Sequence, residues 1–99
     1  MRLSDIEKKA LNKALEGVDG EVFLFGSRTD DKKKGGDIDI LIYSKENAFK
    51  LSKEVTVRFF KVCEEKIDVI VMNPDNLSNE QEAFLNIIEK IKLLNNKVD

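Results

Sequence analysis

Two aspartates stand one residue apart at the start of an apolar run, in the stretch FLFGSRTDDKKKGGDIDILIY that covers residues 23–43. Alternate side chains of a strand point to the same face, so Asp37 and Asp39 project together and the intervening isoleucines project to the other face. Two carboxylates this close repel each other, and a divalent cation between them relieves the repulsion. In proteins Mg²⁺ binds one or two carboxylates together with phosphate oxygens and water. The pair therefore predicts a metal ion bound with a nucleotide.

A third carboxylate and a Gly-Ser pair add to this pattern. Asp68 interrupts the run KIDVIV, which otherwise has the composition of a buried strand. Gly26 and Ser27 directly follow the apolar run EVFLF. A residue without a Cβ lets the backbone approach a ligand closely, and a hydroxyl with the amides of a helical turn donates to phosphate oxygens. Each feature alone also occurs at an ordinary turn or exposed strand end, so the prediction depends on their combination.

Three strands and three helices are expected to position these residues. The strands have β-branched and aromatic compositions and lie at 21–25, 37–43 and 66–73. The helices are expected at 4–16 with Ser4 as cap, at 45–66 after Ser44, and at 79–96 behind a capping box of Ser78 and Gln81. This order predicts an α+β fold, a small mixed β-sheet flanked by helices, formed as a single domain over residues 1–99.

Composition narrows the class of function. Seventeen basic and nineteen acidic residues leave a formal charge of −2, so direct nucleic-acid binding is not expected from overall charge. No apolar run approaches the roughly 20 residues that span a bilayer, which argues against a membrane protein. Cys63 is the single cysteine, and the first ten residues carry charges where a signal peptide needs an apolar region. The predicted location is cytoplasmic.

The motifs together resemble the nucleotidyltransferase signature of the DNA polymerase beta superfamily. The signature reads FGS at 25–27, DIDI at 37–40 and IDV at 67–69. With 99 residues and no second domain, the chain is similar to the minimal nucleotidyltransferases, which are often encoded beside a HEPN-domain protein. The resemblance implies a nucleotidyltransferase-like fold, which agrees with the predicted order of elements.

Site residues follow from the resemblance, position by position. It implies a catalytic and metal-binding set and a nucleotide-binding set: Asp37, Asp39 and Asp68 for two Mg²⁺ ions, and Gly26, Ser27 and Arg28 for ATP. In such chemistry one ion lowers the pKa of the attacking hydroxyl and the other neutralises the leaving pyrophosphate. Asp68 is then expected to bind the first ion and to help remove the proton.

The resemblance implies an enzyme that transfers a nucleoside monophosphate, AMP from ATP, to an acceptor hydroxyl on a HEPN toxin partner, with the chain acting as antitoxin. One departure motivates an alternative, a non-catalytic antitoxin that only covers its partner. Many minimal members continue the Gly-Ser-Arg with a second arginine and a glycine, whereas this chain has Thr29-Asp30-Asp31. The lysines at 32–34 either replace that arginine at the phosphates or form a solvated loop. Transfer to RNA or to an aminoglycoside-like acceptor is a weaker third reading, since 99 residues hold no accessory substrate domain.

Overall fold

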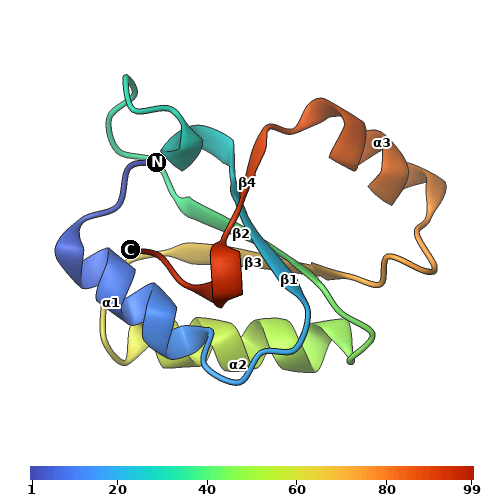
Figure 1. Ribbon diagram of the computed structural model, residues 1–99, viewed down its shortest axis with the longest axis horizontal. Helices are drawn as coiled ribbons and strands as arrows, with labels where there is room; N and C mark the ends of the chain where they lie inside the picture. The colour runs from blue at the N-terminus through green and yellow to red at the C-terminus, as the bar shows by residue number, and fades with distance from the viewer.

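The computed structural model describes residues 1–99 and shows one four-stranded sheet with helices on both of its faces (Figure 1). The strands lie in the order β3-β2-β1-β4; β2 is parallel to β3, and β1 is antiparallel to β2 and β4. The α+β class and the mixed sheet are thus confirmed. No helix is long and apolar enough to cross a membrane. The elements in chain order are α1 (Asp5–Ala14), β1 (Glu21–Phe25), the 3-10 turn η1 (Gly26–Thr29), β2 (Ile38–Tyr43), α2 (Ala48–Phe60), β3 (Ile67–Met72), α3 (Asn79–Ile87), β4 (Lys90–Lys92) and the 3-10 turn η2 (Leu94–Asn96).

The helices α1 and α2 pack together on one face of the sheet, and this face holds most of the core (Figure 1). Alternation along β2 sends three fully buried isoleucines to that face, and α2 adds three buried residues at helical spacing. At the start of α1, the Glu7 amide donates to Ser4 Oγ and the Ser4 amide donates to Glu7 Oε1, so Ser4 is the predicted cap. The buried isoleucines of β2 are Ile38, Ile40 and Ile42, and the buried residues of α2 are Leu51, Val55 and Phe59.

The opposite face of the sheet carries a smaller apolar cluster under α3. Phe25 of β1 meets Phe84 of α3 edge to face, with 5.6 Å between the ring centroids. Leu41 of β2 is fully buried in this cluster. Because Asp39 has the same alternation as Leu41, its carboxylate projects from this face, away from α1 and α2.

The predicted last helix at 79–96 is wrong in its second half. The capping box of Ser78 and Gln81 is present, but α3 ends at Ile87 and the next residue is extended. The segment Lys90–Lys92 instead forms β4 along the free edge of β1, with Ile91 opposite Leu24. Pairing there satisfies backbone groups that the edge of β1 would leave open, and this tertiary gain overrides the helical spacing of the apolar residues.

The start of α2 also differs from the prediction, because its cap is Asn47 and not Ser44. Asn47 Oδ1 accepts a hydrogen bond from the Lys50 amide at 2.9 Å, the normal capping contact. The Ser44 amide still donates to the Met72 carbonyl at 3.0 Å, so Ser44 continues the pairing of β2 with β3. Because Ser44 extends β2, it cannot also cap α2, and the cap is Asn47, three residues later.

Shortening the side chain of Leu93 tests whether the chain after β4 turns this residue into the core. Leu93 is buried in the main core, so we expect Leu93→Ala to lower the free energy of unfolding by about 2–4 kcal/mol through lost packing and a cavity. Its neighbour Leu94 is 74% exposed, and Leu94→Ala is the matched control with an expected change within about 0.5 kcal/mol. Urea denaturation followed by circular dichroism measures both. Equal losses in the two variants would contradict the observed course of the chain.

Candidate active site

Parallel pairing of β2 with β3 brings two of the three aspartates side by side. Asp39 and Asp68 are register partners, so both side chains project from the same face of the sheet. Asp37 precedes the first residue of β2, and alternation gives it the same face as Asp39. The three aspartates can approach one another only if their strands are neighbours in the sheet. The structure meets this condition.

Few protein groups neutralise these carboxylates. The Lys66 ammonium lies 3.3 Å from Asp37 Oδ2, whereas Asp39 and Asp68 have no ion pair. Burial raises the pKa of Asp39, and the negative charges of Asp68 and Asp37 raise it further, while Lys66 acts in the opposite direction. Negative charge thus accumulates at this end of β2 and β3.

The chemistry of the three side chains suits a hard divalent cation such as Mg²⁺, because all are carboxylates on one face of the sheet. They do not meet at one point: no group of three or more His, Cys, Asp or Glu side chains is arranged to hold a metal ion. One of the three, Asp37, is paired with the Lys66 ammonium at 3.3 Å. The three residues therefore suit a divalent cation by their carboxylate chemistry and by the face of the sheet that they share.

Two glycines allow the turn after β1 to lie against the carboxylates. Gly26 begins η1 with φ +78°, and a Cβ at this position would collide with Asp39 Oδ2. A Cβ at Gly36, where φ is +87°, would collide with Ser27 Oγ. The absence of these side chains lets the Gly-Ser turn, the end of the loop and Asp39 occupy one small volume. The Gly-Ser turn thus lies next to the Asp39 carboxylate, and phosphate binding by its amides and hydroxyl stays a prediction.

Arg28 is held by an ion pair that the sequence did not indicate. Its Nη1 and Nη2 donate to the two carboxylate oxygens of Glu7, each at 2.9 Å, and its Nε donates to the Gly36 carbonyl at 3.0 Å. Nη1 also donates to the Arg2 carbonyl, and the side chain is only 11% exposed. Nucleotide binding by Arg28 stays a prediction, and the observed contacts support a positioning role for it in the loop.

Arg2 also holds the loop between β1 and β2, although it lies far from that loop in the sequence. Its Nη2 donates to the carbonyls of Ser27 and Gly35, and its Nε donates to the Asp30 carbonyl at 2.9 Å. Sequence reasoning missed this residue, because an arginine near a helix start carries no signal for a loop more than twenty positions away. The lysines at 32–34 are exposed and form no ion pair, which agrees with a solvated loop and leaves their phosphate contact a prediction.

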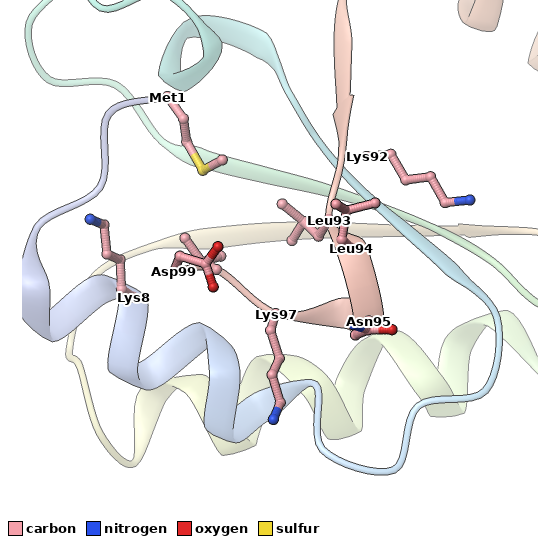
Figure 2. Close-up of a pocket in the computed structure, with 9 residues that line it drawn as sticks. Met1, Lys8, Lys92, Leu93, Leu94, Asn95, Lys97 and Asp99 are labelled. Carbon is pink, nitrogen blue, oxygen red and sulfur yellow. The ribbon is translucent and has the colours of Figure 1, made fainter.

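A cleft that is well separated from the three aspartates lies elsewhere in the molecule. It has a volume of about 530 Å³ and lies between α1 and the residues that follow β4 (Figure 2). Lys8, Lys92 and Lys97 line it together with Asp99, and Lys92 already pairs with Glu21 at 2.9 Å. None of the three aspartates lines this cleft, so the candidate site is defined by the position of its carboxylates and not by the depth of a cavity.

One protein family is matched over nearly the whole chain. The sequence model of a family described as nucleotidyltransferase domain matches residues 5–99. That range contains the Gly-Ser turn and all three aspartates. A search of curated proteins found no match.

The ion pair of Glu7 with Arg28 predicts a stability that falls in acid. Burial acts to raise the pKa of Glu7, but hydrogen bonds led by that from Arg28 outweigh it and lower the pKa from 4.5 to about 2. Because the folded pKa lies below the unfolded one, the stabilisation is complete above about pH 5 and is lost as the pH falls towards 2. We expect about 3 kcal/mol of unfolding free energy to disappear over this range.

Urea denaturation at a series of pH values measures this loss. The variant Glu7→Gln is the control, since it removes the titrating group and is expected to be less stable at neutral pH with a flatter acid limb. The same acid dependence in both proteins would assign the loss to other carboxylates and contradict the prediction.

A pair of glycine substitutions separates backbone strain from contact with the carboxylate. Gly17 has φ +77°, nearly the value at Gly26, but no atom lies within 4 Å of a Cβ placed there. Alanine at either position should cost about 1–2 kcal/mol of stability through the left-handed backbone. Only Gly26→Ala should also displace Asp39, measured as a changed NMR shift of its carboxyl carbon. An unchanged shift would show that the turn does not set the position of this side chain.

Proposed function

Because the chain belongs to the nucleotidyltransferase domain family, we propose that it transfers AMP from ATP to an acceptor hydroxyl in a Mg²⁺-dependent reaction. Nucleotidyl transfer itself follows from the family, and the nucleotide and the metal are the proposal. One observation carries it: the register of β2 and β3 sets Asp39 beside Asp68, with Gly26 against the Asp39 carboxylate. Carboxylates and a phosphate-binding turn in one place are what this reaction needs.

Each side chain has a role in the proposed reaction. Asp37, Asp39 and Asp68 hold the divalent ions, which when bound activate the attacking hydroxyl and neutralise the leaving pyrophosphate. The amides of the Gly-Ser turn and the hydroxyl of Ser27 hold the phosphates. The acceptor oxygen forms a bond to the α-phosphorus while the bond to the β-phosphate breaks, and the hydroxyl proton passes to Asp68. Neighbouring strands of one sheet keep these carboxylates in a constant relation to one another.

The acceptor that we propose is a side-chain hydroxyl of a HEPN-domain partner in the cytoplasm. The support is the resemblance of the sequence motifs to those of the minimal nucleotidyltransferases. In this proposal AMP transfer blocks the ribonuclease activity of the partner, and the chain is the antitoxin. A gene for a HEPN-domain protein next to the gene for this chain would support the pairing, and a free-standing gene would count against it.

A non-catalytic antitoxin is the second candidate, and two observations favour it. The Arg28 guanidinium is engaged by Glu7 and by loop carbonyls, and Thr29-Asp30-Asp31 stands where many minimal members have another arginine. In this alternative the chain neutralises its partner by covering it, and the nucleotidyltransferase fold is a scaffold.

Transfer of label from ATP tests the proposal. The purified protein is incubated with Mg²⁺, its HEPN-domain partner and ATP labelled at the α-phosphate, beside a reaction with ATP labelled at the γ-phosphate. We expect label on the partner from the α-position only. The double variant Asp37→Asn with Asp39→Asn should reduce transfer to background while leaving the protein folded. It removes two repelling carboxylates and breaks only the exposed ion pair of Asp37 with Lys66.

Asp19→Asn is the matched control, since Asp19 is exposed, forms no ion pair and should retain full transfer. Label from the γ-position alone would mean phosphoryl transfer and would refute the reaction class. Neutralisation of the partner by the double variant, without any label, would favour the non-catalytic antitoxin.

A further inference from the structure

Lys66 is the one cation within ion-pair distance of the three aspartates. Its Nζ lies 3.3 Å from Asp37 Oδ2, and no other lysine or arginine forms an ion pair with any of the three. The position follows from the ladder: Ile38 is the register partner of Ile67, so the residues that precede them, Asp37 and Lys66, also lie next to each other.

The residue before Lys66 contacts the turn that follows β1. The preceding residue, Glu65, lies 3.7 Å from Arg28, which belongs to η1. Lys66 directly precedes β3, and Gly26 of the Gly-Ser turn lies against Asp39, the register partner of Asp68 in β3. The side chain of Lys66 is 70% exposed and forms no hydrogen bond or ion pair other than that with Asp37, so its four-carbon stem is free to turn.

We propose that Lys66 competes with a divalent cation for Asp37 and, once displaced, binds the phosphates of the nucleotide. The inference rests on the proposed metal site and adds a residue that the motif does not contain. An ammonium beside Asp37 reduces the attraction of the carboxylates for a second cation. A bound triphosphate offers the displaced ammonium several anionic oxygens, so metal and nucleotide bind better together than separately. Lys66 thereby couples the two binding events.

Metal binding without nucleotide gives the first test. Mn²⁺, which EPR detects, is titrated into the wild type and into Lys66→Met, which keeps the length of the stem and removes the charge. We expect Lys66→Met to bind Mn²⁺ about two- to fivefold more tightly, a modest factor because the lysine is exposed. The difference should shrink as ionic strength rises. Lys66→Arg retains the charge and should bind like the wild type.

Nucleotide binding gives the second test and has the opposite expected sign. With saturating Mg²⁺, Lys66→Met should bind α,β-methylene-ATP more weakly than the wild type in calorimetry, because a phosphate contact is lost. Lys45→Met is the matched control for both tests: Lys45 pairs with Asp75 at 3.0 Å with similar exposure, away from the three aspartates. It should change neither affinity.

The outcomes separate this inference from the proposed function. Wild-type binding of Mn²⁺ that Lys66→Met leaves unchanged or weakens would overturn the role of Lys66 while the metal site stands. An unchanged nucleotide affinity would overturn the phosphate contact. No Mn²⁺ binding by any of the proteins would remove the metal site and the role of Lys66 together. Tighter Mn²⁺ binding with weaker nucleotide binding would support the inference even if no label reached the HEPN-domain partner.

Discussion

The buried ion pair of Glu7 with Arg28 is the interaction on which the geometry of the candidate site depends. It joins the first turn of α1 to the turn that follows β1, and through the Gly36 carbonyl it reaches the residue before Asp37. Burying two charges is unfavourable unless their hydrogen bonds are satisfied. Here the guanidinium forms two parallel bonds to the carboxylate and further bonds to carbonyls, so the pair is stable where it lies. The pair thereby ties both ends of the polar loop to α1.

The sheet adds the second constraint, because its register decides which charges meet. Parallel pairing of β2 with β3 sets Asp39 beside Asp68, although like charges side by side are unfavourable. The apolar residues that alternate with them are buried against α1 and α2, so the strands cannot shift to relieve the repulsion. Core packing therefore maintains a cluster of negative charge that the carboxylates alone would disperse, and Lys66 offsets part of it.

Local patterns predicted much of this protein. The predicted cap at Ser4, the capping box at Ser78, three strands and the α+β class agree with the structure. Caps and strand alternation depend on residues a few positions apart. The prediction failed where distant contacts decide. The strand β4 exists because β1 offers an open edge, and Ser44 continues a strand because Met72 lies beside it.

The same division holds for the candidate site. The sequence by itself determined which residues are the candidates for the chemistry. The spacing of Asp37 and Asp39 and the Gly-Ser pair are local features that do not depend on distant contacts. Only the tertiary structure decided what surrounds them: Arg28 faces Glu7, Arg2 secures the loop, and Lys66 lies beside Asp37. Such pairings join residues up to 33 positions apart. The periodicity of a sequence does not specify which distant charges lie in contact once the core has packed.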